Sequence, residues 1–149
     1  MKENELKEFL SSGFDGFEVH LDPAGERADI VLNRPPLNVI EMNQRDELRS
    51  VFEALDQLSD VRVIVLRGVG EHFSSGGNIR GFLEASPEHV SKLADNVAAP
   101  ARCSKPVIAA NRGYTFGVGF ELSLACDFRI ASETTLYALP EQKLGQIPG

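Results

Sequence analysis

Residues 105–131 read KPVIAANRGYTFGVGFELSLACDFRIA, and their pattern predicts the fold class. Its apolar run at 107–110 follows a Lys-Pro pair and is typical of a buried strand. A glycine-containing segment at 113–119 separates that run from a predicted helix at 120–125, and residues 126–131 are predicted to form the next strand. Because strands alternate with a helix here, the stretch indicates an α/β protein rather than a run of helices.

The chain before this stretch repeats the alternation. Residues 17–21 and 28–32 alternate apolar with polar side chains around a turn, which predicts a β-hairpin. From Asn43, a suitable N-cap, apolar residues recur at helical spacing and predict an amphipathic helix of about four turns. The β-branched run at 61–66 predicts a central strand that is covered on both faces. The predicted pattern is strand, strand, helix, repeated along the chain.

Two further segments complete the predicted architecture. A Ser-Pro pair at 86–87 opens a second helix, which runs to Val97 and is limited by Pro100. Residues 135–139 follow a polar turn and are predicted to run back as the hairpin partner of the strand before them. The fold class predicted from these elements is α/β, built from similar ββα units.

Length and composition fit one globular domain. A chain of 149 residues corresponds to a single domain, and its 42% hydrophobic and 25% charged residues exclude a disordered or low-complexity protein. Residues 1–16 are polar and are expected to form an N-terminal arm or short helix, which leaves 17–149 as the core. Because the last residues, 144–149, have the composition of a turn, we expect the sequence to cover only the front part of a longer protein.

The net charge argues against nucleic acid as a partner. Lys and Arg number 15 and Asp and Glu number 22, so the chain carries −7, whereas binding to a phosphate backbone needs a positive surface. No stretch approaches the roughly 18 apolar residues of a membrane span, and the acidic N-terminus differs from a secretory or transit peptide. We therefore expect a soluble cytoplasmic protein with no membrane partner.

The two cysteines predict neither a metal site nor a disulfide. Cys103 and Cys126 are 23 positions apart, with no second pair and no histidine at ligand spacing. Both are expected to act as small buried apolar residues, and no metal is predicted.

Two glycine-bearing loops are the first candidates for a site. Residues 73–79 follow the predicted strand at 61–66, and residues 117–119 follow the strand at 107–110. Loops at strand ends bind ligands in α/β folds, and glycine lets a backbone N–H approach one atom closely. Two such N–H groups can form an oxyanion hole, and the second loop also opens a helix whose dipole favours negative charge. The alternative is that both loops are tight turns that only pack backbone against backbone.

Known nucleotide-binding motifs are excluded by single residues, and a serine nucleophile, conceivable at Ser74 or Ser75 with His72, lacks its usual motif. A dinucleotide fingerprint would need glycine where the chain has Phe73 or Leu122, and no lysine follows a glycine as a phosphate-binding loop requires. The Gly-x-Ser-x-Gly elbow of serine hydrolases is also absent. The three histidines share no spacing and are expected at the surface.

Glu121 and Glu141 are the candidate acid and base. Glu121 lies among apolar residues at a helix start, and Glu141 follows Pro140 directly after a strand, so the element lengths allow the two to meet. In an apolar pocket a carboxyl pKa rises, and two neighbouring carboxyls separate their pKa values into one acid and one base. The alternative for each is an ordinary solvated carboxylate.

From Phe17 to Gly149 the chain resembles the enoyl-CoA hydratase/isomerase (crotonase) superfamily. The resemblance is carried, in the family's order and spacing, by LNRPPLNVI at 32–40, HFSSGGNI at 72–79, the stretch quoted above and LPEQKLGQIPG at 139–149. It implies a crotonase-like spiral of repeated ββα units. Family chains continue past residue 149, so the C-terminal helical part is expected to be missing here.

The resemblance also implies roles for individual residues. Gly77 and Val118 match the positions whose amides form the oxyanion hole, and Glu121 and Glu141 match the catalytic glutamates. Asn78 stands where the family often has Asp, and Val118 stands where it has glycine. The residues aligned with the acyl-CoA site are Leu37, Val39, Gly77, Asn78, Ile79, Arg80 and Val118.

The implied function is that of an enoyl-CoA hydratase, which adds water across the 2,3 double bond of an acyl-CoA thioester through a stabilised enolate. No cofactor is expected, because coenzyme A is part of the substrate, and the full-length protein is expected to form a homotrimer or a dimer of trimers. Retention of both glutamates favours hydratase over isomerase. The alternatives are an enoyl-CoA isomerase, a hydrolase of cyclic or β-keto acyl-CoA compounds, and a non-catalytic binding protein on this fold, including the RNA-binding kind.

Overall fold

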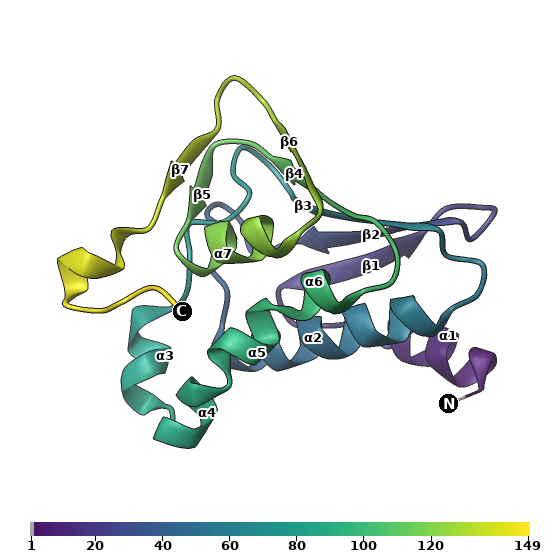
Figure 1. The fold of residues 1–149 in the computed structure, drawn as a ribbon, viewed down its shortest axis with the longest axis horizontal. Helices are drawn as coiled ribbons and strands as arrows, with labels where there is room; N and C mark the ends of the chain where they lie inside the picture. The colour runs from purple at the N-terminus through teal and green to yellow at the C-terminus, as the bar shows by residue number, and fades with distance from the viewer. Residues whose placement is uncertain (1) are drawn as a thin grey trace.

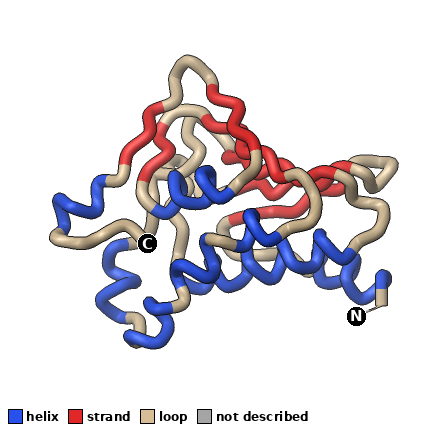
Figure 2. Tube along the Cα trace, viewed as in Figure 1, coloured by secondary structure: helices blue, strands red, loops and turns tan. Residues whose placement is uncertain are grey.

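The structure is a computed structural model that describes residues 2–149. Its strands lie in two sheets with helices packed against one side, as Figures 1 and 2 show. The strands are β1 (Phe17–Leu21), β2 (Arg27–Leu32), β3 (Val63–Gly68), β4 (Val107–Asn111), β5 (Tyr114–Phe116), β6 (Phe128–Ala131) and β7 (Leu136–Ala138). The helices are α1 (Glu3–Ser11), α2 (Met42–Gln57), α3 (Ile79–Glu84), α4 (Pro87–Ser91), α5 (Leu93–Val97), α6 (Ala99–Arg102), α7 (Val118–Ala125) and the 3-10 helix η1 (Pro140–Leu144).

The larger sheet has the strand order β1-β2-β3-β4-β6. Strands β1 and β2 form an antiparallel hairpin in which Phe17 pairs with Leu32, so the predicted hairpin is confirmed. The remaining neighbours are parallel, with Ile30 opposite Leu66 and Leu66 opposite Ala109. Because β3 lies in the middle of this sheet, its predicted central place is also confirmed.

The second sheet shows how the chain spirals. Strand β5 pairs in parallel with β7, while single bridges join Ser74 to Thr115 and Ile40 to Gly77. Each turn of the chain therefore crosses the larger sheet, makes a short pairing in the second layer and then enters a helix. The predicted repetition of ββα units is confirmed, and in each turn the start of the helix follows directly on the short pairing.

Helix α2 covers one face of the larger sheet and supplies much of the core (Figure 1). Its Phe52 and Leu55 are fully buried, as are Ile64 and Leu66 of β3. The prediction that the β3 strand is covered on both faces is wrong. Its other face carries half-buried side chains, because the helices lie on one side of the sheet only.

The N-terminal segment packs onto the domain. Helix α1 buries Leu6 and Leu10 in the same core as the sheet and α2. The segment predicted as an arm or short helix is thus a helix with its own apolar face.

Several helix boundaries differ from the predicted ones. Helix α2 begins at Met42 with Glu41 as N-cap, because the side chain of Gln44 accepts the Glu41 N–H at 3.3 Å, so the prediction of Asn43 as the cap is wrong. The helix predicted from 86 to 97 is two short helices, α4 and α5, and Pro100 lies inside α6. Proline fits the first turn of a helix, where its missing N–H has no partner to lose.

The strands β6 and β7 do not form the predicted hairpin. Strand β6 pairs with β4 in the larger sheet, whereas β7 pairs with β5 in the second sheet. The chain between them therefore turns a corner of the spiral, a geometry that strand length alone does not reveal.

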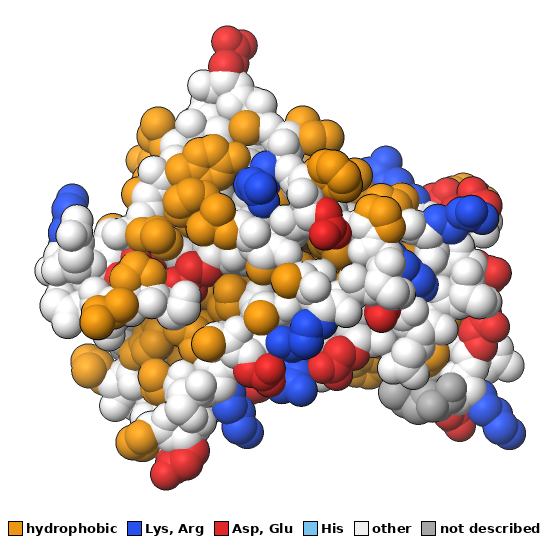
Figure 3. Space-filling view, in the orientation of Figure 1, with side chains coloured by type: hydrophobic (Ala, Val, Ile, Leu, Met, Phe, Trp, Pro, Cys, Tyr) orange, Lys and Arg blue, Asp and Glu red, His pale blue; other side chains and the backbone are white. Residues whose placement is uncertain are grey.

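Exposed apolar side chains gather over α7, β6 and β7, where Figure 3 shows a group of hydrophobic atoms. The large ones are Leu124, Phe128, Ile130, Leu136 and Tyr137. The thiol of Cys126 is buried, as predicted, and Cys103 is partly buried. Within residues 2–149, none of the helices combines the length and the apolarity that crossing a membrane would need.

Candidate active site

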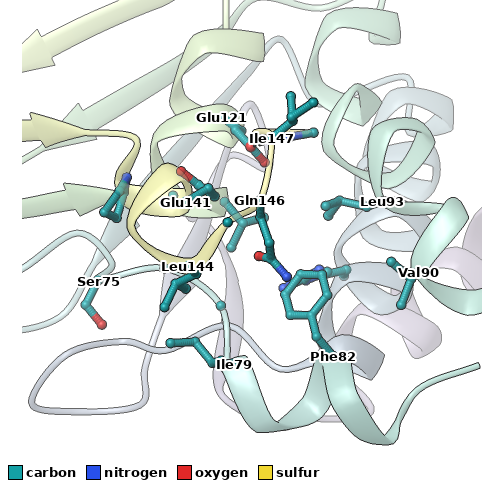
Figure 4. Close-up of a pocket in the computed structure, with 18 residues that line it drawn as sticks. Ser75, Ile79, Phe82, Val90, Leu93, Glu121, Glu141, Leu144, Gln146 and Ile147 are labelled. Carbon is teal, nitrogen blue, oxygen red and sulfur yellow. Dashed lines mark hydrogen bonds between the residues drawn. The ribbon is translucent and has the colours of Figure 1, made fainter. Parts of the chain in front are cut away.

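A cavity of about 490 Å³ opens between α7, η1 and the helices α3 to α5. Its volume lies within the range of roughly 300–1,000 Å³ that is usual for small-molecule sites. Figure 4 shows Glu121 and Glu141 at one side of the cavity and Leu93 across from them. The lining includes both glycine loops, both candidate glutamates and apolar side chains of Ile79, Phe82, Val90, Leu93, Leu144 and Ile147.

The first candidate donor is the N–H of Gly77. Ile40 bridges to Gly77 by donating to the Gly76 carbonyl at 2.9 Å and accepting the Asn78 N–H at 3.2 Å. In such a parallel bridge the partner strand is bonded through the residues on either side of the central one. The N–H and carbonyl of the central residue, Gly77, therefore point away from Ile40. No acceptor within residues 2–149 takes this N–H.

The second candidate donor is the N–H of Val118, the first residue of α7. The first N–H groups of a helix have no intrahelical partner, and no group in the described chain accepts this one. Gly117 precedes it with φ 53° and ψ −129°, a backbone conformation that favours glycine. An oxygen held at Val118 would also face the positive end of the α7 dipole.

The two loops are in contact, which brings the two donors together. A Cβ built on Gly117 would lie 3.7 Å from the Cα of Gly76, and one built on Gly76 would lie 3.2 Å from the Phe116 carbonyl oxygen. Gly77 follows Gly76 in the chain and Val118 follows Gly117, and both line the cavity. The arrangement can therefore present two free N–H groups to one oxygen atom.

Glu121 lies on the first turn of α7, with 7% of its surface exposed. One carboxylate oxygen accepts the Gly149 N–H at 2.8 Å, and the other has no partner within the described residues. Burial raises the pKa of Glu121, and the nearby charge of Glu141 raises it further, while the Gly149 N–H and Arg45 act in the opposite direction. This carboxyl is thus poised to hold a proton more readily than a solvated glutamate.

Glu141 enters the cavity from η1, a different turn of the spiral. Its Oε1 lies 3.0 Å from where a Cβ on Gly117 would be, and its Oε2 is buried with no partner within residues 2–149. Two carboxyls with an unused oxygen each can hold a water molecule or exchange protons with a ligand.

A family model described as enoyl-CoA hydratase/isomerase matches residues 26–149. The chain belongs to this family. Its larger sheet and its spiral of ββα units agree with that membership.

Relatives and solved structures within the enoyl-CoA hydratase/isomerase family cover most of the chain. Carnitinyl-CoA dehydratase of Proteus mirabilis is 36% identical over 134 residues, which is 87% of this chain and 51% of the relative. The protein of the same name from Shigella flexneri is 37% identical over 137 residues, again 87% and 51%. The crystal structure of enoyl-CoA hydratase from Bacillus anthracis aligns with a TM-score of 0.81 at 32% identity, covering 91% of this chain and 54% of that one. The chain spans about half the length of the curated relatives it matches.

The residues aligned with the family's acyl-CoA site are not all at the cavity. Gly77, Ile79 and Val118 line it. Asn78 instead caps α3, accepting the Arg80 N–H at 3.1 Å, and Arg80 itself is exposed. The aligned residues outside the lining are Leu37, Val39, Asn78 and Arg80.

Arg45 of α2 is a cavity residue that sequence reasoning missed. Only 3% of its surface is exposed, and its guanidinium lies 4.6 Å from the centre of the Phe82 ring. One signal was available, since Arg45 falls three residues from both Met42 and Leu48 on the apolar stripe of α2. An arginine at an inward position of an amphipathic helix is therefore the feature to look for.

No group of three or more His, Cys, Asp and Glu side chains in the described part of the chain is placed to hold a metal ion. The site as it stands consists of backbone N–H groups, two carboxyls, one arginine and apolar walls. Such a set can hold a polarised carbonyl and move protons.

Proposed function

We propose that the protein hydrates 2-enoyl-CoA thioesters. The observation that carries the proposal is the meeting, in one cavity, of two unpaired backbone N–H groups and two carboxyls from different turns of the spiral. Family membership supports an acyl-CoA thioester as the substrate class. The proposed reaction moves only water and protons, so it needs no cofactor besides the coenzyme A that the substrate carries.

The N–H groups of Gly77 and Val118 stabilise the charge that develops during the reaction. The thioester carbonyl oxygen accepts both hydrogen bonds, and its negative charge grows as the thioester becomes an enolate. Loss of one such donor typically costs about 2.7–4 kcal/mol of transition-state stabilisation. The positive end of α7 adds to the same effect.

Glu121 and Glu141 hold the reacting water between their unused oxygens. One carboxylate removes a proton from the water as its oxygen bonds to C3, and the other carboxyl delivers a proton to C2. The electron pair of the double bond passes through the enolate and returns to form the new C–H bond. The raised pKa of Glu121 suits this exchange, because one carboxyl must give a proton while the other takes one.

Hydration of crotonyl-CoA by the complete protein, followed by loss of the enoyl absorbance, tests the proposal. Glu121→Gln and Glu141→Gln should each reduce kcat by about 100-fold or more, since general acid–base catalysis contributes typically 10²–10⁴-fold. Glu133→Gln, in an exposed turn, is the matched control and should leave kcat unchanged. Activity that survives both site substitutions would remove the proposed acid and base roles.

Product analysis separates hydration from the other reactions of the family. Incubation with crotonyl-CoA should give a 3-hydroxyacyl-CoA. With a 3-enoyl-CoA as substrate, the wild type and Glu141→Gln should convert the compound at the same rate. Rapid interconversion of 3-enoyl-CoA and 2-enoyl-CoA, or release of free coenzyme A, would replace hydration by isomerisation or hydrolysis.

A further inference from the structure

The buried guanidinium of Arg45 lacks hydrogen bonds. Its Nε, Nη1 and Nη2 have no partner within residues 2–149, although each is removed from the surface. A guanidinium carries five N–H donors, and leaving a buried charge without partners is costly. The ring of Phe82 lies over the guanidinium as a cation–π partner, but it is not a conventional hydrogen-bond acceptor. A guanidinium in this state can take an acceptor that the described residues do not place on it.

The carboxylates nearest to Arg45 are engaged elsewhere. Both oxygens of Glu41 accept the side-chain amide of Asn78, at 3.1 and 3.0 Å. The oxygens of Asp46 take the Asn96 amide at 2.8 Å and the His89 ring at 2.7 Å. These charges stabilise the cation at a distance without using its donors.

The third nearby carboxylate, Glu121, likewise makes no hydrogen bond to Arg45. Its bonded oxygen accepts the Gly149 N–H, and its attraction for the guanidinium is electrostatic only. Arg45 lines the cavity together with Glu121 and Phe82, and its donors have no partner within residues 2–149.

Arg45 also lies beside a donor of the oxyanion hole. A Cβ on Gly77 would collide with Nη2 of Arg45 and would lie 3.6 Å from Cζ, so the guanidinium occupies the space that a side chain at 77 would fill. A thioester whose carbonyl is held at the Gly77 N–H would consequently lie close to the guanidinium. An acidic group a few bonds along the acyl chain is within reach of a planar donor pair.

We propose that Arg45 binds a carboxylate carried by the acyl group, so that the preferred substrate is a 2-enoyl-CoA with a second, free carboxylate. The carboxylate supplies the acceptors that the buried guanidinium lacks, in the bidentate geometry that arginine favours. This inference rests on the proposed hydration and adds the chemical class of the acyl group. A cationic acyl group, such as the trimethylammonium of a carnitinyl thioester, would instead meet a like charge.

Three thioesters that share the 2-butenoyl chain but differ in the substituent at C4 test the proposal on the complete protein. They are crotonyl-CoA, 4-carboxy-2-butenoyl-CoA and 4-trimethylammonio-2-butenoyl-CoA. The wild type should hydrate the carboxylated compound with the highest kcat/KM and the cationic one with the lowest. Arg45→Met, which keeps an unbranched side chain but removes the charge and the donors, should reduce kcat/KM for the carboxylated compound by at least about 30-fold. For crotonyl-CoA, where Arg45 acts only through its charge on Glu121, the same substitution should cost less, so the preference for the carboxylated compound should disappear.

Arg49→Gln is the matched control, because Arg49 lies one turn further along α2 and pairs with Glu53 and Asp95 at the surface. It should not change the order of the three substrates. A binding measurement gives a readout without turnover: 4-carboxybutanoyl-CoA should raise the thermal midpoint of the wild type more than butanoyl-CoA does, and Arg45→Met should abolish that difference. Because an unpaired buried cation costs stability, Arg45→Met should itself fold at least as well as the wild type.

The outcomes distinguish the proposed hydration from the proposed carboxylate site at Arg45. If no thioester is hydrated but the carboxylated probe still binds through Arg45, the proposed reaction fails and the anion site stands. If crotonyl-CoA is hydrated and Arg45→Met lowers all three rates equally, the anion site is wrong and Arg45 serves the packing of the site or the charge of Glu121. A wild type that prefers the cationic thioester would overturn the inference as well.

Discussion

Ser74 locks the loop of Gly77 to the loop of Asn38. Its hydroxyl donates to the Asn38 carbonyl at 2.7 Å and accepts the Gly76 N–H at 3.1 Å, and the side chain is fully buried. Asn38 in turn donates to the carbonyls of Val69 and His72 at 3.0 and 2.8 Å. The position of the Gly77 N–H therefore depends on the hydrogen bonds that the buried Ser74 hydroxyl makes.

Ser74→Ala should lower the free energy of unfolding by about 1–3 kcal/mol, because it leaves a buried N–H and a buried carbonyl without partners. It should also reduce kcat, since the loop that carries Gly77 is no longer held. Chemical denaturation and crotonyl-CoA hydration measure the two effects. Ser75→Ala, next in the chain but with no hydrogen bond from its hydroxyl among the described residues, should change stability by less than about 0.5 kcal/mol. Equal stabilities of the two variants would contradict this role of Ser74.

Val118→Pro removes the proposed oxyanion donor while keeping the helix. Proline is well tolerated at the first position of a helix, and Gly117, with φ 53° and ψ −129°, lies outside the right-handed α region that proline disfavours in the residue before it. The variant should therefore fold normally and lose roughly 100- to 1,000-fold in kcat. Val118→Ala keeps the N–H and trims the side chain, so it should retain most of the activity. Similar losses in both variants would assign the effect to the side chain rather than to the amide.

Gly117→Ala combines backbone strain with a clash in the site. The new Cβ would lie 3.0 Å from Oε1 of Glu141, and the positive φ of 53° is unfavourable for alanine by about 1–3 kcal/mol. Both stability and kcat should fall. Gly70→Ala shares the positive φ, 70°, but nothing lies within 4 Å of its Cβ, so it should lose stability and keep its activity. Unchanged kcat in Gly117→Ala would mean that Glu141 does not need its present position.

The raised pKa of Glu121 predicts how stability depends on pH. Burial keeps this carboxyl protonated to a higher pH in the folded chain than in the unfolded chain, where glutamate titrates near about 4.3. Between these two pKa values the native state binds more protons, so the contribution of Glu121 to stability is fully present below the lower one and is lost as the pH rises through the higher one. Glu121→Gln should therefore gain stability relative to the wild type at neutral pH, and the gain should shrink as the pH falls toward 4.

Urea unfolding at several pH values measures the difference. The same substitution at exposed Glu133 should show no comparable trend. A gain for Glu121→Gln that is independent of pH would refute the link between burial and proton binding.

Apolar periodicity was sufficient to predict the elements that build the core. Strands β1 and β2 alternate, and α2 repeats its apolar residues every three or four positions, because one face of each is buried. Periodicity says little about elements shorter than a full repeat, such as β5, which has three residues and was predicted only as part of a glycine segment. It also cannot say which sheet a strand joins, and for this reason the hairpin of β6 and β7 was wrong.

The candidate site could be predicted where its chemistry lies in backbone amides and carboxylates of recognisable segments. Gly77, Val118, Glu121 and Glu141 all line the cavity, although they come from separate loops. Their roles remain predictions until tested. Arg45 could not be found in the same way, because charged residues on a helix usually face solvent and only the packing around Phe82 reveals that this one does not.

Because of the spiral, insertions and deletions in some loops disturb the site more than those in other loops. Val118 and Glu141 follow closely on β5 and β7, the strands of the second sheet, so one residue inserted between Phe116 and Val118 would rotate the amide of Val118 away from the cavity. The turn between β1 and β2 lies elsewhere in the sheet and supports none of these groups. Natural variants of this protein should thus accumulate insertions and deletions at residues 22–26 while keeping the spacing around 117 constant.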